Sequence, residues 1–600
     1  MQIGWLAVLF ACSAAQKPPR AEDVLVRGND NTHPAGTLRD GTLSLDLEIG
    51  EADWRWEQQL PAYRVLAFAE RNGPLTTPGP LVRVREGTRI RVAITNRVAR
   101  DVVVHGLHAR PGVDVPLRVP ARSTVETQFA ADAPGTYYYW GAVADGNGDR
   151  EQDDSQLTGA FVVDPARGGP PDRIFVIAYH GQAAPVKLDA WTINGRSWPE
   201  TERLEYRVGE PVHWRWINAT SHHHPMHMHG TYFRVHSRGD NVRDEVAANP
   251  PEVVTEGLRP SSTMAMTWSP AQAGNWLFHC HNLFHVMADN RLQLPSWYED
   301  YAKLGHDQHM AGLVLGIHAR PHGPPPVRVT TAPRKLALEI GERPGIRFRA
   351  SGLDRPGLGY SVDGSPVTSP GPVIVLERGR PVEITITSHI AHATQVHWHG
   401  IELESYYDGV PHWGGDSRQM TPQIDPGKTF VAKFTPPRAG TFIYHTHFND
   451  YVQLASGLHG PLIVVEPGQR FDPEVDHLFV ISRDGFDEEN DPILLDGTPS
   501  PPPLTLRAGT HRLRFVGITA VTRATVKLTS SDVPVTWRAV AKDGATFAKA
   551  ESRTAQFMIY PGETYDFELD VDRSADLVLD VVSEFGKPLH AGTRLLMRPR

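Results

Sequence analysis

Residues 78–87 read PGPLVRVREG, and residues 370–379 repeat the pattern as PGPVIVLERG. Each copy continues into a segment in which apolar and polar residues alternate, and each then reaches a histidine: residues 90–96 and His105, residues 382–388 and His397. Alternation with a period of two is typical of a β-strand that has one buried face. The repeat therefore predicts two copies of one β-rich unit.

Further matches extend this repeat along the chain. Residues 134–139, PGTYYY, are echoed by AGTFIY at 439–444, and a weaker pair matches residues 212–218 with residues 512–517. Short strands bounded by Gly and Pro favour Greek-key sandwiches. We expect an all-β chain of four β-sandwich domains in the order A-B-A′-B′, covering residues 36–166, 167–330, 331–467 and 468–600. The polar segment 294–309 is expected to be a loop or short helix inserted into the second domain.

The composition is that of a soluble globular protein. Apolar residues make up 40% of the 600 positions and charged residues 22%, while 53 Gly and 51 Pro favour short strands and turns over long helices. The net charge of −9 argues against a nucleic-acid partner.

The first sixteen residues, MQIGWLAVLFACSAAQ, are interpreted as an export leader. Their apolar run is too short to span a bilayer and ends in small residues, which predicts cleavage after Ala15 and a place in the periplasm or cell envelope of a bacterium. The sequence LFAC at 9–12 also resembles a lipoprotein processing site, so a lipid anchor on Cys12 is the alternative and the one expected membrane attachment. Cys280 is then the only cysteine of the mature chain, and no internal disulfide is expected.

The stretch 274–285, GNWLFHCHNLFH, holds that cysteine between two histidines. If it forms a strand that leads into a short loop, His279 and His281 share one face and Cys280 points to the other. A thiolate with a nearby imidazole such as His285 suits a trigonal copper that exchanges single electrons. The flanking histidines would then hold a different metal site, and the covalent path from Cys280 would conduct electrons to it.

Three more histidine clusters accompany this stretch: HHHPMHMHG at 222–230, HWHG at 397–400 and HTH at 445–447. A His-x-His pair on a strand places both imidazoles on one face, ready to share a metal. One such pair is weak evidence, because a lone buried Cys or His is usually a packing residue. So many of them in two neighbouring domains have no packing rationale and predict a metal centre.

With these motifs the chain resembles the multicopper oxidases, the family that includes laccases, over nearly its whole length. The resemblance implies cupredoxin-like domains and four coppers per chain, with the type 1 copper on His224, Cys280 and His285. It implies a type 2 copper on His227 and His397, and a coupled type 3 pair on six further histidines: His229, His279, His281, His399, His445 and His447. This trinuclear cluster is expected between the second and third domains.

The outer domains depart from the family pattern. The first domain has Trp140 and Ala142 where the third has its second His-x-His, and its own first pair is reduced to His105 and His108. We therefore expect the first domain to be a copper-free relic with a structural role. The fourth domain shows no ligand motif.

The axial place of the type 1 copper falls on Leu313 in GLVLGI, residues 312–317. A side chain that cannot coordinate the metal should raise the reduction potential. Met287 and Met310 are the rival axial ligands.

Asp408, in YYDGVP at 406–411, matches the acidic residue that the family places after its first His-x-His motif, where it delivers protons. The alternative is a turn aspartate before Gly409. The positions that carry a second acid in some relatives are Asn282, Leu283, Phe284 and Val286 here, so the sequence predicts no second proton route at that place.

The resemblance implies an enzyme, a copper oxidoreductase that takes electrons from a small-molecule donor and uses O2 as the acceptor. A laccase-like oxidase of phenols or aromatic amines is the first hypothesis, since no Met-rich insert points to a dedicated cuprous oxidase. Oxidation of Cu(I), Fe(II) or Mn(II) is the second. A copper-binding resistance protein without turnover is the alternative from another class, and it would tolerate gaps among the eleven ligand positions. A copper nitrite reductase ranks below these.

Overall fold

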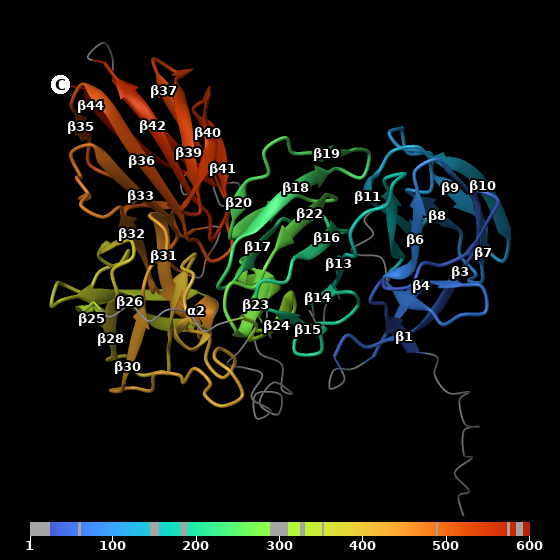
Figure 1. Cartoon of the computed structure of the whole chain (residues 1–600), viewed down its shortest axis with the longest axis horizontal. Coiled ribbons are helices and arrows are strands. Elements are labelled where there is room, and N and C mark those ends of the chain that lie inside the picture. Colours follow the sequence, from blue (N-terminus) through green and yellow to red (C-terminus); the bar gives the residue numbers. More distant parts are fainter. Residues whose placement is uncertain are drawn as a thin grey trace, which may run out of the picture.

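The computed structural model describes residues 25–57, 62–144, 155–181, 189–287, 310–323, 331–350, 353–485, 487, 490–572, 576–583 and 592–599. These residues form eight β-sheets that follow one another in pairs along the chain (Figure 1). The prediction of an all-β chain is confirmed. The leader with Cys12 and the segment 294–309 lie outside the described residues.

The first sandwich has sheets ordered β1-β5-β4-β3-β7-β10, with β2 beside β3, and β6-β12-β11-β8-β9. Its strands are β1 (Leu25–Gly28), β2 (Thr37–Arg39), β3 (Thr42–Trp54), β4 (Tyr63–Glu70), β5 (Thr76–Thr77), β6 (Gly79–Arg85), β7 (Thr88–Asn96), β8 (Val102–His105), β9 (Leu117–Val119), β10 (Thr124–Ala131), β11 (Gly135–Val143) and β12 (Thr158–Asp164).

The second sandwich has sheets ordered β14-β13-β16-β22-β18-β19, with β20 beside β18, and β15-β24-β23-β17-β21. Its elements are β13 (Arg173–Gly181), β14 (Asp189–Ile193), β15 (Arg203–Arg207), β16 (Val212–Asn218), β17 (His224–Met228), β18 (Phe233–Gly239), β19 (Asp244–Val246), β20 (Glu252–Val253), β21 (Thr255–Leu258), β22 (Thr263–Trp268), β23 (Gly274–Cys280), the 3-10 helix η1 (Leu283–His285) and β24 (Val314–Arg320).

The third sandwich is smaller, with sheets ordered β26-β25-β28-β30 and β27-β32-β31-β29. Its elements are β25 (Arg334–Ala350), β26 (Leu353–Val362), β27 (Ile374–Glu377), β28 (Val382–Ser388), β29 (Val396–His399), the 3-10 helix η2 (Ser405–Tyr407), β30 (Thr429–Phe434), β31 (Gly440–Thr446), the helix α2 (Asp450–Ala455) and β32 (His459–Val465).

The fourth sandwich has sheets ordered β34-β33-β36-β42-β39-β40 and β35-β44-β43-β37-β38, with β41 beside β37. Its strands are β33 (Asp476–Ser482), β34 (Leu494–Leu495), β35 (Leu504–Leu506), β36 (Gly509–Gly517), β37 (Ala524–Ser530), β38 (Val533–Pro534), β39 (Thr536–Lys542), β40 (Ala545–Thr554), β41 (Gln556–Ile559), β42 (Thr564–Val571), β43 (Leu577–Ser583) and β44 (Gly592–Pro599).

One strand pairing recurs in all four sandwiches. A long early strand of the first sheet pairs in parallel with a later strand of that sheet: β3 with β7, β13 with β16, β25 with β28 and β33 with β36. The strand that opens the second sheet pairs in parallel with the last strand of its sandwich: β6 with β12, β15 with β24, β27 with β32 and β35 with β44. Parallel pairs between strands distant in sequence require connections that cross between the sheets.

The second sandwich lies between the first on one side and the third and fourth on the other (Figure 1). Each sandwich has an apolar core between its sheets, and that of the second continues into residues of its neighbours, such as Tyr451 of the third and Ile518 of the fourth. The apolar core is therefore continuous across the junction of these three sandwiches. No helix among the described residues is long and apolar enough to cross a membrane.

Candidate metal centres

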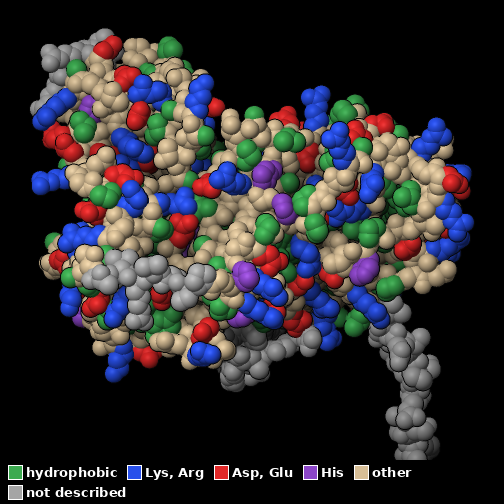
Figure 2. Space-filling view, viewed as in Figure 1, with side chains coloured by type: hydrophobic (Ala, Val, Ile, Leu, Met, Phe, Trp, Pro, Cys, Tyr) green, Lys and Arg blue, Asp and Glu red, His purple; other side chains and the backbone are tan. Residues whose placement is uncertain are grey.

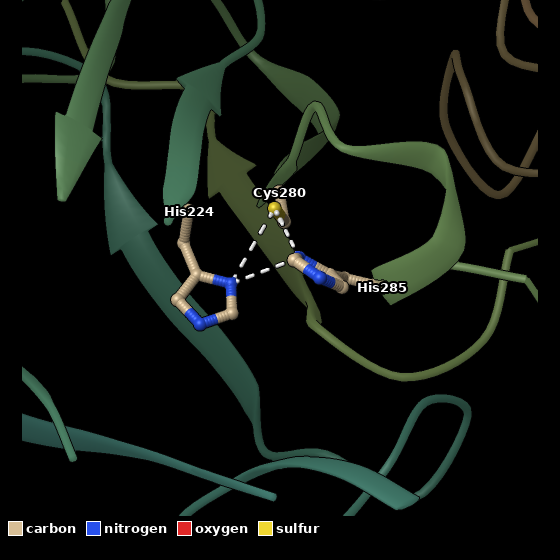
Figure 3. A group of neighbouring side chains, drawn as sticks. All are labelled: His224, Cys280 and His285. Atoms are coloured by element: carbon tan, nitrogen blue, oxygen red, sulfur yellow. Dashed lines mark hydrogen bonds between the residues drawn. The ribbon is translucent and has the colours of Figure 1, made fainter. Parts of the chain in front are cut away.

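A cysteine and two histidines of the second sandwich converge in its core (Figure 3). Cys280 ends β23, His224 begins β17 and His285 belongs to η1. The Cys280 Sγ lies 3.8 Å from the His224 Nδ1 and 3.4 Å from the His285 Nδ1, and the two nitrogens are 3.0 Å apart. All three side chains are buried, so three donor atoms face one point from which water is excluded.

Neighbouring groups hold this trio in place. The Thr220 Oγ1 lies 2.9 Å from the His224 Nε2, and this contact leaves the Nδ1 facing the sulfur. The Asn282 backbone N–H donates to the Cys280 Sγ at 3.4 Å, while its side-chain oxygen accepts from the Phe284 N–H and caps η1. The loop after β23 therefore places His285 beside the sulfur.

Eight histidines form a second cluster where the second and third sandwiches meet. Strand pairing sets His227 opposite His279 across β17 and β23, and His397 opposite His445 across β29 and β31. Nitrogens from different strands approach closely, at 2.9 Å for His229 and His279 and 3.4 Å for His227 and His397. The cluster consists of His227, His229, His279, His281, His397, His399, His445 and His447, all buried.

Several imidazole nitrogens of this cluster are buried without a hydrogen-bond partner among the protein atoms. They are both ring nitrogens of His281, Nδ1 of His399, and Nε2 of His445 and His447. Leaving a buried polar group unpaired costs about 1–3 kcal/mol. Five unpaired nitrogens in one cluster therefore indicate that the cluster binds a partner from outside the protein chain. A metal cation fits this place, because burial lowers the pKa of His281, His399, His445 and His447 well below the usual value and each neutral ring offers a lone pair.

The donor types fit copper. Imidazole and thiolate ligands suit this metal, and burial raises the pKa of the Cys280 thiol, so the thiolate forms only when a bound cation replaces its proton. The residues present in both groups therefore fit the coppers that the sequence resemblance implies.

Comparison with known proteins agrees with this donor set. One family model described as multicopper oxidase matches residues 71–168 and again residues 362–469, and a second model of the same description matches residues 176–295, together more than half of the chain. The chain belongs to the multicopper oxidase family. Members of this family bind copper.

Individual relatives of this multicopper oxidase match over shorter stretches. A probable nitrite reductase-hydroxylamine oxidoreductase fusion protein of Kuenenia stuttgartiensis is 27% identical over 243 residues, 35% of this chain and 26% of that protein. Laccase-2 of Botryotinia fuckeliana is 40% identical over 117 residues, 19% of each chain. The match thus spans about a quarter or less of these curated relatives. A blue copper oxidase of Nitrosomonas europaea aligns with 45% of this chain and 86% of its own at 23% identity and a TM-score of 0.36.

In this multicopper oxidase Asp408 faces the histidine cluster from the third sandwich. It follows η2, is 1% exposed, and its Oδ2 lies 2.7 Å from the His229 Nδ1. Its backbone oxygen also accepts from the His397 Nδ1 at 2.7 Å. Each contact fixes which ring nitrogen points into the cluster. The alternative reading as a turn residue also holds, since the Asp408 N–H donates to the Ser405 oxygen.

Leu313 lies beside the Cys280 group. The Cys280 N–H donates to the Leu313 oxygen and the Leu313 N–H to the His285 oxygen, both at 3.0 Å. Its side chain is fully buried in the same core against which Met287 and Met310 pack. Met287 and Met310 are only partly buried, and the choice of Leu313 stays a prediction.

Two residues near the histidine cluster escaped the sequence analysis. Asp450 begins α2, and its Oδ2 lies 3.8 Å from the His447 Nδ1, with burial raising the pKa of the carboxyl to about 8. The sequence analysis looked for a second acid only near Cys280 and found none there, whereas the position of Asp450 three residues after His447 was the available signal. Gly562 of the fourth sandwich also touches the cluster, at a place that no motif marks.

A cavity of about 710 Å³ adjoins the Cys280 group. The His285 ring forms part of its wall, beside Trp191, Phe284 and Tyr179. The Trp191 ring lies 4.0 Å from that of His285 and 4.4 Å from that of Tyr179. Asp189, the one carboxylate among the described lining residues, accepts the Tyr179 hydroxyl at 2.6 Å. The wall is completed by residues of the fourth sandwich, among them Tyr560.

In the first sandwich the reduced motif has protein partners. The His105 Nδ1 lies 2.5 Å from Asp114 Oδ2, the His108 Nε2 lies 3.3 Å from Asp114 Oδ1, and the His105 ring stacks on Trp140 at 4.0 Å. Trp140 thus fills space where the third sandwich has a histidine.

On the molecular face in Figure 2, basic and acidic side chains are interspersed.

Proposed function

We propose that this multicopper oxidase is laccase-like, oxidising phenols or aromatic amines one electron at a time and reducing O2 to water. Four donor molecules each lose one electron, and one O2 takes up the four electrons and four protons. The observation that carries this proposal is the convergence of the eleven ligand candidates into two buried groups, ten of them through close donor atoms and His447 through ring contacts with His229 and His279. The dipeptides on either side of Cys280 join the two groups.

In this proposal His224, Cys280 and His285 hold a type 1 copper, His227 and His397 a type 2 copper, and the remaining six cluster histidines a type 3 pair. Bound copper would supply one-electron transfer at the first group and reaction with O2 at the second. The chain contributes a short path between them, because Cys280 is bonded through the backbone to His279 and His281, which belong to the other group.

The cavity at His285 is the proposed donor site. Its described walls are rich in aromatic rings, which pack well against a planar aromatic donor. Hard ions such as Mn(II) prefer several oxygen ligands, whereas the single carboxylate Asp189 is already occupied by the Tyr179 hydroxyl. This favours aromatic donors over Fe(II) or Mn(II), two of the ions in the second hypothesis.

Asp408 is assigned to the supply of protons at the cluster, since its carboxylate contacts His229 in a site closed to bulk water. We also assign export to the leader, so that the protein acts in the cell envelope.

The test is oxygen uptake by the copper-loaded protein with a panel of phenols, aromatic amines and reduced metal ions. We expect uptake with the aromatic donors at one O2 per four donor molecules, and none with the Cys280→Ser variant. Uptake with metal ions alone would favour a metallo-oxidase, and bound copper without any uptake would favour a non-catalytic copper-binding protein.

A further inference from the structure

A turn of the fourth sandwich reaches the histidine cluster. A Cβ added to Gly562 would lie 2.9 Å from the Cγ and Cδ2 of His281 and 3.0 Å from the Cε1 of His399. Real Cβ atoms do not approach neighbours so closely without a shift of the neighbour. The Gly562 backbone therefore packs directly against one ring from the second sandwich and one from the third.

This turn, Tyr560–Glu563, is held rigidly. The Glu563 N–H donates to the Tyr560 oxygen at 3.1 Å, and the Glu563 carboxylate accepts the Tyr560 N–H at 2.9 Å. Gly562 has φ +83° and donates its N–H to the Gly517 oxygen at 2.8 Å. Pro561 precedes it, as in a type II turn, which requires the positive φ that glycine adopts freely.

The turn is also anchored on the second sandwich. The Tyr560 hydroxyl lies 2.8 Å from the His223 Nδ1, and its ring covers Gly257, where a Cβ would come within 2.3 Å of Tyr560 Cε2. Behind the turn, the buried Lys542 ammonium bonds Glu563 at 2.7 Å and Glu256 of β21 at 2.9 Å. These buried ion pairs hold the turn against β21, since separating them would leave a buried charge without a partner.

A second contact from the fourth sandwich supports the same cluster. One carboxylate oxygen of Asp543 accepts the N–H groups of Val254 and Thr255, each at 3.0 Å. Val254 and Thr255 in turn hold the His227 Nδ1, through a backbone oxygen at 3.0 Å and a hydroxyl at 3.1 Å. The fourth sandwich thus fixes the segment that orients His227.

We propose that the fourth sandwich, which has no ligand motif, is a positioning domain for the trinuclear site, and that Gly562 is the residue through which it sets the rings of His281 and His399. This inference rests on the ligand assignment of the proposed function. Gly562 touches no reacting atom, so it acts by positioning ligands and not as a catalytic residue.

Gly209 provides a matched control. It has φ +80° in a turn with the same hydrogen bonds: Glu210 N–H to Arg207 oxygen at 3.0 Å, Arg207 N–H to Glu210 carboxylate at 2.9 Å, and Gly209 N–H to Pro270 oxygen at 3.0 Å. A Cβ at Gly209 meets nothing within 4 Å. Gly209→Ala therefore introduces the same backbone strain without touching a histidine.

The experiment compares Gly562→Ala and Gly209→Ala, both copper-loaded, by copper content, electron paramagnetic resonance and oxygen uptake. We expect Gly562→Ala to keep the blue absorption of the Cys280 group while a larger fraction of its copper becomes detectable by resonance, because the type 3 pair is uncoupled or incomplete. Oxygen uptake should fall about tenfold to a hundredfold, as for misplaced catalytic groups. Gly209→Ala should resemble the parent protein in all three.

Equal behaviour of the two variants would overturn the positioning role. If Gly562→Ala gives no blue protein, Tyr560→Ala replaces it, since it removes an anchor of the turn without adding an atom; a parent-like resonance spectrum for that variant would also overturn the inference. A parent protein that binds no copper at the cluster would instead contradict the proposed function itself.

Discussion

His229 shows how a single carboxylate can prepare a ligand. The Asp408 carboxylate accepts a hydrogen bond from the His229 Nδ1–H at 2.7 Å, which leaves the His229 Nε2 as the atom that faces the other histidines. Partners of this kind typically change metal affinity or activity by 10–100-fold when they are removed. In contrast, His397 and His445 are oriented by backbone oxygens, which no side-chain substitution removes.

Asp408→Asn should therefore lower oxygen uptake about tenfold to a hundredfold, with reduced copper at the histidine cluster and an intact blue site. Copper analysis and visible absorption measure the two sites separately. The control is Asp416→Asn, an exposed aspartate on the same connection, which should leave both unchanged. Parent-like copper content and uptake in Asp408→Asn would show that this contact does not orient the ligand.

Leu313→Met is the test of the axial position. A thioether placed near the copper should lower the reduction potential of the type 1 site, whereas the native leucine leaves the potential high. Redox titration of the blue band measures it. Met310→Leu and Met287→Leu serve as controls and should not change the potential; an effect in either one, with none in Leu313→Met, would move the axial ligand to that methionine.

At the scale of elements, β23 carries residues of both groups because successive side chains of a strand point to opposite faces. The sequence was sufficient to predict the all-β class and to propose these groupings, since alternation and His-x-His spacing are local properties. The contacts of Gly562 and Asp543 could not be predicted from the sequence. They join residues far apart in the sequence, such as Val254 and Asp543 at 289 positions, and nothing local at a Pro-Gly turn shows what it packs against.

Asp450 illustrates the same limit within one element. Its place at the start of α2 is ordinary for an acidic residue, which favours the positive end of a helix. Only the path of the chain after β31 turns this carboxyl towards His447 and buries it. Burial, and not spacing, raises the pKa of Asp450 to about 8.

For the whole molecule, the buried histidines couple stability to pH. Burial lowers the pKa of His279 to about 4 and those of His227 and His229 well below their usual value, whereas in the unfolded chain each has a pKa of about 6.5. Below pH 6.5 the unfolded chain thus binds more protons than the folded chain. The contribution of these histidines to stability is full above that pH and is lost as pH falls towards 4, because protons then bind preferentially to the unfolded chain.

The copper-free protein should accordingly unfold at lower denaturant concentration at pH 5 than at pH 7. Equilibrium unfolding, followed by the fluorescence of the buried tryptophans of the second sandwich, measures this. Midpoints that do not change across this range would mean that these histidines are protonated, or accessible to water, in the folded apoprotein.

The central claim is that the second and third sandwiches together hold one copper at Cys280 and a three-copper cluster, and it is tested most directly by the copper content and colour of the purified, copper-loaded chain. The account predicts four coppers per chain and a blue band that Cys280→Ser abolishes while the histidine cluster keeps its metal. One or two coppers per chain, or a blue band that survives in Cys280→Ser, would contradict it.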